Sequence, residues 1–180
     1  MQDVSIITLN GHTPRIHSSA YIAPGCRIIG DVEIGEDCSI WYNCVLRADV
    51  NAIRIGARSN VQDGTVIHCD SDKGPVKGFP TIIEEDSLIG HMAMLHGCTI
   101  KSKSLVGLGS IVMDGCVVES NAMLAAGAML TPGKVVPSFQ MWGGRPARHM
   151  KDLDELWSMG NQFAVAHYVQ NGRTHRAAIN

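Results

Sequence analysis

The sequence predicts an all-β fold, a parallel β-helix of about six coils, followed by an α-helix at its C-terminal end. Aliphatic or methionine residues recur at every sixth position, and a small residue usually stands four positions after each of them. This pairing is typical of hexapeptide β-helices, in which short strands form the sides of a prism and small residues turn its corners. From Asp152 onward the repeat disappears, and apolar residues fall on one helical stripe.

The six-residue repeat is interrupted twice, so it divides into three blocks along the sequence. The first block extends from Ile16 to Leu46, and after a three-residue slip the second extends from Ile55 to Ile67. The third block starts at Ile82 and continues through Leu88 and Met94 to Leu130. We therefore expect a nine-residue excursion between adjacent sides within residues 69–80. At three hexads per coil, the 18 hexads make about six coils.

The ends of the chain complete a two-part organisation. Residues 1–150 are predicted to form the hexapeptide-repeat domain, in which residues 1–15 add a strand or cover to the first coil. Residues 151–180 are predicted to hold the C-terminal helix and a tail. Asn171-Gly172 is a typical helix stop, so residues 173–180 are expected to be a solvated tail.

Composition excludes several classes of function. The net charge is −2 and there is no Lys/Arg cluster, which argues against nucleic acid as a partner. There is no apolar run long enough for a membrane span and no secretory signal pattern, so we expect a cytoplasmic protein without a membrane partner. The six cysteines form no CxxC pair, and most share one phase of the repeat, as small buried residues do.

Three histidines are the candidate functional residues. His91 and His96 are five residues apart, which does not suit one face of a helix. With the nine-residue excursion, the hexads of Ile67 and Met94 lie on the same side of the prism, one coil apart. His68 and His96 would then be strand neighbours about 5 Å apart. His91 lies on the preceding side, where it more easily serves a neighbouring subunit.

Two imidazoles from one chain and one from the next would suit Zn²⁺ with an open fourth position. Such a site lowers the pKa of water from 15.7 to roughly 7 and supplies hydroxide at neutral pH. Three imidazoles also accept Fe²⁺ or Co²⁺. Cys69 follows His68 directly, but alternation along the strand points its thiol away from the histidine's side.

The repeat, together with four short motifs, resembles the γ-class carbonic anhydrase family of left-handed β-helix proteins. The motifs are Asn60-Val61-Gln62-Asp63-Gly64, Ile89-Gly90-His91, Leu95-His96-Gly97-Cys98 and Gly144-Arg145-Pro146-Ala147. The resemblance implies a homotrimer with metal sites between subunits and reversible hydration of CO₂ to bicarbonate by a zinc-bound hydroxide. It also implies that His68 and His96 bind the metal from one subunit and His91 from its neighbour.

Four further residues match functional positions of that family. The resemblance implies that Arg47, Asp49 and Asp63 form ion pairs across the trimer interface, and that Gln62 orients the hydroxide. The simpler alternative for Arg47 and Asp49 is a solvated ion pair worth about 0–1 kcal/mol.

The chain departs from the family pattern at its proton-transfer positions. The archetype has a glutamate where this chain has Val50, and a longer acidic loop where this chain has residues 69–80, which contain no glutamate. Asp70 and Asp72 are the alternative carboxylates in the loop. Two other functions stay open: a non-catalytic metal-binding trimer, and an acyltransferase that uses acyl-CoA, since hexapeptide folds also host such enzymes.

Overall fold

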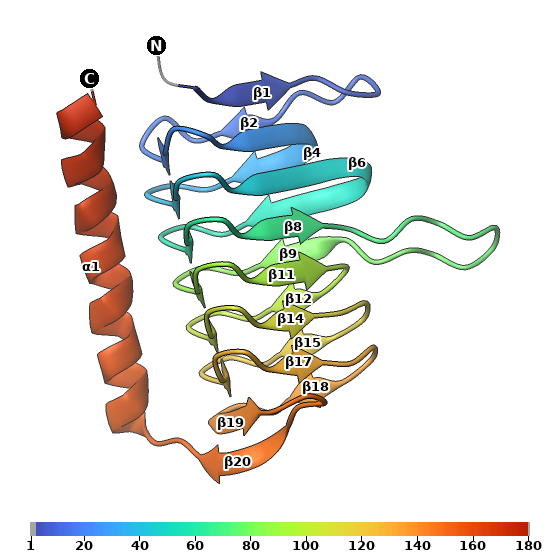
Figure 1. Ribbon diagram of the computed structural model, residues 1–180, viewed down its shortest axis with the longest axis vertical. Helices are drawn as coiled ribbons and strands as arrows, with labels where there is room; N and C mark the ends of the chain where they lie inside the picture. Colours follow the sequence, from blue (N-terminus) through green and yellow to red (C-terminus); the bar gives the residue numbers. More distant parts are fainter. Residues whose placement is uncertain (1–2, 180) are drawn as a thin grey trace.

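The computed structural model describes residues 3–179 and shows a stack of parallel coils with one long helix beside it (Figure 1). The three sides of the prism are three ladders of short parallel strands, so the predicted parallel β-helix with a C-terminal helix is confirmed. Each ladder holds seven parallel strands, slightly more than the expected six coils. The N-terminal strand β1 (Ser5–Ile7) pairs with β4 and covers the first coil, as expected for residues 1–15.

The first and second sides share two long strands that continue around a corner. They are β4 (Arg27–Ile34) and β6 (Val45–Ile55). The first side also contains β1, β8 (Val66–His68), β11 (Met94–His96), β14 (Ile111–Val112) and β17 (Met129–Leu130). The second side also contains β2 (Arg15–Ile16), β9 (Thr81–Ile83), β12 (Thr99–Ile100), β15 (Val117–Val118) and β18 (Val135–Val136).

The third side consists of separate two-residue strands and ends in a hairpin. Its strands are β3 (Tyr21–Ile22), β5 (Ser39–Ile40), β7 (Asn60–Val61), β10 (Leu88–Ile89), β13 (Leu105–Val106), β16 (Met123–Leu124) and β19 (Gln140–Gly143). The last strand, β20 (Arg148–Asp152), pairs antiparallel with β19. The predicted boundary between residues 150 and 151 falls inside β20.

The inward residues confirm the six-residue repeat and correct its register in one coil. Ile83 and Leu95 are fully buried, whereas Met94 is half exposed, so the expected inward positions of Ile82, Leu88 and Met94 are each one residue too early. The excursion between sides is therefore ten residues long rather than nine. The extra residue is recovered at the next corner, where Gly97 adopts φ +54° and only five residues separate Leu95 from the inward Ile100.

The helix α1 (Glu155–Ile179) lies antiparallel to the stacking direction, so its C-terminal end is near the first coils (Figure 1). Asp154 caps it, because its Oδ1 accepts a hydrogen bond from the Trp157 amide at 2.8 Å. The predicted stop at Asn171-Gly172 is wrong: the helix continues to Ile179, so residues 173–179 are no tail. Among residues 3–179, no helix is both long and apolar enough to span a membrane.

Contacts with the first coils explain why the helix continues past Gly172. This glycine is buried, and a Cβ added to it would lie 3.3 Å from the Ser39 Cβ. Beyond it, Arg173 bonds to the Asp37 carboxylate at 2.9 Å, and His175 bonds to the Tyr42 hydroxyl at 2.9 Å. Packing on the coils thus outweighs the weak helix propensity of Asn-Gly. Asn180 lies outside the described residues.

Candidate metal centre

His68 and His96 face each other on the first side of the prism. They are register partners on β8 and β11, and their ring centroids are 5.0 Å apart, as the sequence predicts. The Nδ1 atom of His68 lies 3.1 Å from the Nε2 atom of His96. Two nitrogens each about 2.0–2.1 Å from one metal ion in tetrahedral geometry are separated by little more than 3 Å. The two rings therefore already have the spacing of two ligands of one ion.

The outer nitrogen of each ring is held by an aspartate. His68 Nε2 lies 2.7 Å from Asp49 Oδ1, and His96 Nδ1 lies 2.5 Å from Asp114 Oδ1. A carboxylate on the far side of an imidazole is the usual support of a metal-binding histidine, because it fixes the tautomer and the orientation of the ring. The donor set and its supports fit a divalent transition metal such as Zn²⁺.

Arg47 joins the same cluster through Asp49. Its guanidinium forms an ion pair with Asp49 Oδ2, while the other carboxylate oxygen bonds to His68. Burial acts to raise the pKa of Asp49, but the hydrogen bonds from His68 and Arg47 outweigh burial and leave this pKa below its usual value. His68 and His96, the predicted neighbours, are therefore brought together within one chain, and Arg47 and Asp49, expected only as an ion pair, lie beside them.

His91 lies at a different corner, between the third and first sides. Its Nδ1 atom is 2.8 Å from Asp63 Oδ2, so this histidine also has a carboxylate on one ring nitrogen. His91 and Met92 form the turn before β11, and His96 is the last residue of that strand, so a whole side of the prism, roughly 10 Å or more, separates the two histidines. Ligands of one ion lie far closer together than this. Within residues 3–179, no three His, Cys, Asp or Glu side chains of one chain are grouped to hold a metal.

The Gln62 side chain forms no hydrogen bond with His68, His91 or His96. It is buried, and its Nε2 donates to the Asn60 Oδ1 at 3.0 Å on the third side, next to the helix. Asp63, the next residue, holds His91. Cys69 is buried, with its thiol pointing toward the Arg47 carbonyl at 3.9 Å, and burial raises its pKa. Its thiol thus faces the interior, away from His68, as strand alternation predicts.

Asp114 is the functional candidate that sequence reasoning missed. It lies in the corner after β14, one coil beyond His96, in the stretch Val112-Met113-Asp114-Gly115. Aspartate is common at β-helix corners, so its type carries no signal. The register of β11 and β14 would have identified it, because it shows that a carboxylate 18 residues after His96 lies one coil away, next to the histidine.

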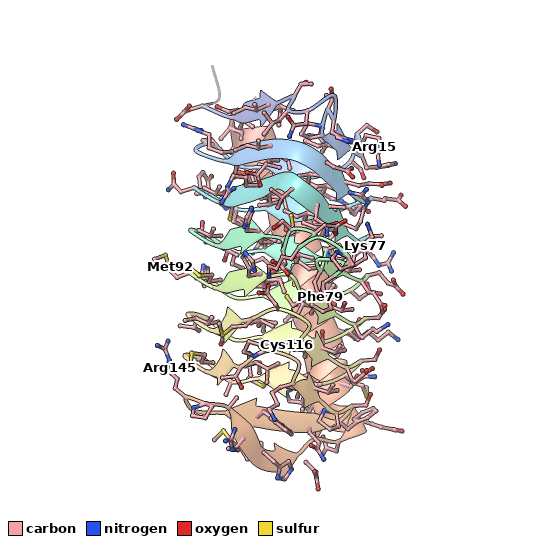
Figure 2. All side chains as sticks on the ribbon, turned by 90° about the vertical axis from the view of Figure 1, so that its right-hand side faces the viewer. Arg15, Lys77, Phe79, Met92, Cys116 and Arg145 are labelled. Carbon is pink, nitrogen blue, oxygen red and sulfur yellow. The ribbon has the colours of Figure 1, made fainter. Side chains whose placement is uncertain are left out.

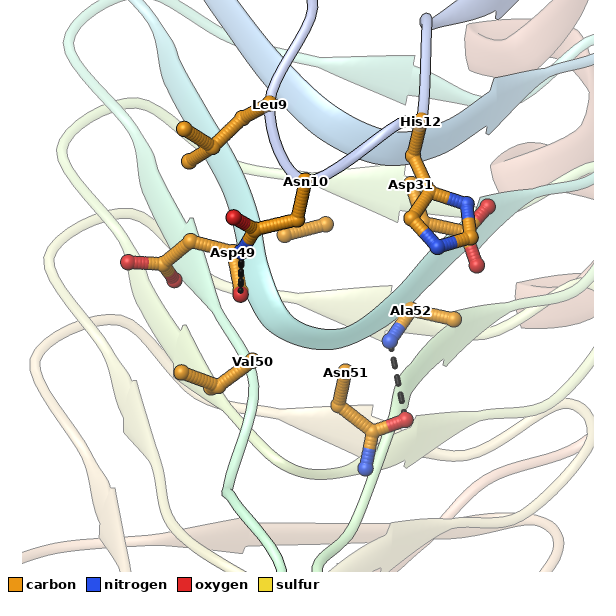
Figure 3. Close-up of a pocket in the computed structure, with 9 residues that line it drawn as sticks. Leu9, Asn10, His12, Asp31, Asp49, Val50, Asn51 and Ala52 are labelled. Atoms are coloured by element: carbon orange, nitrogen blue, oxygen red, sulfur yellow. Dashed lines mark hydrogen bonds between the residues drawn. The ribbon is translucent and has the colours of Figure 1, made fainter.

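A pocket of about 220 Å³ lies on the other side of the Asp49 backbone (Figure 3). The Asp49 carboxylate points away from the His12 and Asp31 side chains that line the opposite wall (Figure 3). Several polar groups of the pocket have partners within the chain: Asn10 donates to the Asp49 carbonyl, and Asn51 bonds to the Ala52 amide. The pocket therefore flanks the histidine cluster without opening onto its ring nitrogens.

Comparison with known proteins identifies the family. A model of the bacterial transferase hexapeptide, described as six repeats, matches residues 13–48. A carbonic anhydrase of Geobacillus kaustophilus is 41% identical over 96% of this chain and 91% of its own length. The mitochondrial gamma carbonic anhydrase 1 of Arabidopsis thaliana is 43% identical over 91% of this chain, which spans only 60% of that relative's length.

A solved structure shows the same fold under a different functional name. A Bacillus cereus protein named provisionally as an acetyltransferase has a TM-score of 0.93 and 36% identity, covering 98% of this chain and 99% of its own. The fold is therefore shared by relatives with different functional names. The similarity to carbonic anhydrases extends over nearly the whole chain, and the chain belongs to the γ-carbonic anhydrase-like family of hexapeptide-repeat proteins.

Proposed function

We propose that the protein is a metal-dependent carbonic anhydrase that hydrates CO₂ at sites shared between the subunits of a homotrimer. The observation that carries this proposal is the pair of facing nitrogens of His68 and His96, each ring backed by its own aspartate. The similarity of this chain to proteins named as carbonic anhydrases supports the choice of reaction. CO₂ and water give bicarbonate and a proton, so the site must supply a nucleophile and release a proton.

The third ligand in this proposal comes from the neighbouring subunit. The Nδ1 atom of His91 bonds to Asp63, and its Nε2 atom lies on the opposite edge of the ring. In the other two histidines, likewise, an aspartate holds one ring nitrogen and leaves the other available. The exposed fraction of its side chain is 47%, so the ring is accessible to a partner. His68 and His96 of one subunit with His91 of the next would then make a three-imidazole site.

An apolar surface beside these histidines supports assembly at this edge. Val66, Met92, Met94 and Leu108 are exposed on the first side and its corner with the third side. Met92 and Arg145 lie along the same edge of the molecule (Figure 2). Exposed apolar clusters of this kind mark protein interfaces. In the proposed trimer, Arg47, Asp49 and Asp63 lie beside the same interface, and ion pairs across it would add to the Arg47–Asp49 and His91–Asp63 pairs within each chain.

The residues of the chain divide the chemical work. Zn²⁺, or Fe²⁺ or Co²⁺ in its place, would be held by His68 and His96 of one subunit and His91 of its neighbour, and would supply the Lewis acidity that makes water a nucleophile near neutral pH. Asp49, Asp114 and Asp63 each accept the N–H of a histidine and leave the other ring nitrogen free as a ligand. We assign to Gln62, whose amide is fixed by Asn60, the hydrogen bond that orients the attacking water.

Proton release is where this chain differs from the family archetype. Val50 stands at one of the glutamate positions and is half exposed. In the loop between β8 and β9, Asp70 pairs with Lys73 and Asp72 pairs with Lys77. Both carboxylates are engaged in ion pairs, so we expect proton transfer to external buffer to limit turnover. The location that we expect for the protein is the cytoplasm.

Replacing His91 tests the metal site and the reaction together. The wild-type protein, purified without chelator, is expected to hold about one metal ion per chain, and His91→Ala to hold less than about 0.2. Stopped-flow CO₂ hydration at several buffer concentrations is expected to fall more than about 100-fold in His91→Ala. His167→Ala, which changes a histidine on α1, serves as the matched control and should retain both metal and activity.

Three outcomes would decide between the candidate functions. A metal-free wild type that consumes acetyl-CoA in the presence of an amine or alcohol acceptor would contradict the proposal and favour the acyltransferase. A metal-loaded wild type as slow as His91→Ala at every buffer concentration would also contradict it, and would favour a non-catalytic metal-binding trimer. Metal-dependent hydration that disappears in His91→Ala would support the carbonic anhydrase.

A further inference from the structure

Asp114 is held beside His96 by two segments of the chain, residues 96–97 and the loop between β8 and β9. Its Oδ1 lies 2.5 Å from His96 Nδ1, and a Cβ added to Gly97 would lie only 2.6 Å from the same oxygen. The absence of a side chain at position 97 therefore leaves the space that the carboxylate uses. The second segment is the loop between β8 and β9, whose Phe79 lies next to both Gly97 and Gly115.

Phe79 covers this corner from the outside. A Cβ at Gly97 would lie 3.1 Å from the Phe79 Cβ, and one at Gly115 would lie 3.2 Å from the Phe79 Cζ. The loop is fixed at its base, because the Asp70 amide donates to the Phe79 carbonyl at 2.8 Å. Phe79 lies on the face that is turned to the viewer in Figure 2, above Cys116. The carboxylate of Asp114 is thus confined, although the exposed fraction of its side chain is 33%.

The chemistry of a neutral imidazole explains what this confinement does. A neutral ring carries one proton, and only the other nitrogen has a lone pair to offer a metal. A carboxylate cannot donate at neutral pH, so a contact with Asp114 requires the proton of His96 to be on Nδ1. The lone pair is then on Nε2, the atom that lies 3.1 Å from His68 Nδ1.

We propose that Asp114 is a positioning residue, which holds the Nδ1–H tautomer of His96 and directs its Nε2 toward the shared metal site. This inference deepens the proposed function and rests on it only for the identity of His68 and His96 as metal ligands. An asparagine at position 114 keeps the shape but can donate as well as accept. It therefore permits the wrong tautomer, in which Nε2 carries the proton.

Metal affinity measures this role directly. Metal is removed with a chelator, and Co²⁺ or Zn²⁺ binding is then measured by competition with a coloured chelator. Asp114→Asn is expected to bind about 10–100-fold more weakly than the wild type, as found for other residues that support metal-binding histidines. Asp152→Asn is the matched control: Asp152 bonds to His149 at 3.0 Å in the β19–β20 hairpin, away from the site, and its loss should leave affinity unchanged.

A second measurement needs no metal. Two-bond ¹H–¹⁵N spectra of the full-length, metal-free protein at about pH 8 report the tautomer of each neutral histidine. The His96 signals should show the Nδ1–H form in the wild type and a mixture in Asp114→Asn. Equal metal affinities, or a His96 tautomer that is the same in both proteins, would overturn the proposal. If the wild type binds no metal, the proposed function fails, while the tautomer measurement still decides the role of Asp114.

Discussion

At the scale of single residues, the proposed metal site is built from three histidine–aspartate pairs. His68 is paired with Asp49, His91 with Asp63 and His96 with Asp114. The sequence predicts these three histidines as candidate ligands, because their phase in the six-residue repeat sets them apart from the other five. Two of the aspartates lie close to recognisable motifs, but Asp114 becomes visible only when the register between neighbouring coils is known. A contact between residues one coil apart leaves no local trace in the sequence.

The ion pair between Arg54 and Asp31, which includes none of the three histidines, gives a second prediction about single residues. Arg54 donates to the Asp31 carboxylate at 2.8 Å, and this hydrogen bond lowers the pKa of Asp31 below its usual value, against the effect of burial. The unfolded carboxyl keeps a pKa of about 4, so on acidification the unfolded chain takes up the proton first. The stabilisation by Asp31 is thus present above about pH 4 and is lost as the pH falls through the folded pKa.

Asp31→Asn should therefore lower the free energy of unfolding at pH 7 by about 1 kcal/mol, and by less at acid pH. Urea denaturation of both proteins at one protein concentration, at pH 7 and at about pH 3, measures the difference. If the gap between wild type and variant stayed constant across this range, the pair would have no pH-dependent role.

At the scale of elements, the repeat predicts the strands better than it predicts what interrupts them. The six-residue repeat predicts most of the inward residues. It cannot predict the length of the loop between β8 and β9, because a loop has no periodicity. The one-residue error at Ile82 is corrected only by pairing, which matches Ile83 with Ile55 and Ile100. The end of α1 was missed for a similar reason, because the contacts of its last turns are with coils more than 130 residues away.

Two glycines of α1 make a matched pair for testing how the helix is held. A side chain at Gly160 would meet nothing within 4 Å, whereas one at Gly172 would meet the Cβ atoms of Ser39 and Tyr21 at 3.3 and 3.4 Å. Gly160→Gln should raise the free energy of unfolding by about 0.5 kcal/mol through helix propensity. Gly172→Gln should lower it by about 1–3 kcal/mol, since the side chain pushes the helix off the first coils.

Thermal and urea unfolding, with far-UV circular dichroism as the signal, would compare the two variants. Equal changes of stability in the two variants would show that the C-terminal half of α1 does not pack on the coils as described.

At the scale of the whole molecule, the prism separates groups that the proposed chemistry must bring together. In the proposed trimer, two corners of the prism would hold complementary parts of one site, with His68 and His96 at one corner and His91 at the other. A single chain cannot join them, since they lie at opposite ends of one side of the prism, roughly 10 Å or more apart. Closed rotational symmetry solves this problem, because each subunit can offer both corners and each interface can then complete one site. The exposed apolar residues near His91 lie where such an interface would form.

Subunit complementation tests this shared site most directly. His91→Ala and His96→Ala are each expected to bind almost no metal and to hydrate CO₂ hardly at all. The two variants are mixed in equal amounts, unfolded together and refolded into random trimers. A site is intact only when one subunit supplies His91 and its neighbour supplies His68 and His96, which holds for roughly a quarter of the interfaces. The mixture should therefore regain roughly a quarter of the wild-type metal content and activity. Mixed trimers without any recovery, while refolded wild type recovers fully, would contradict a site built from two subunits.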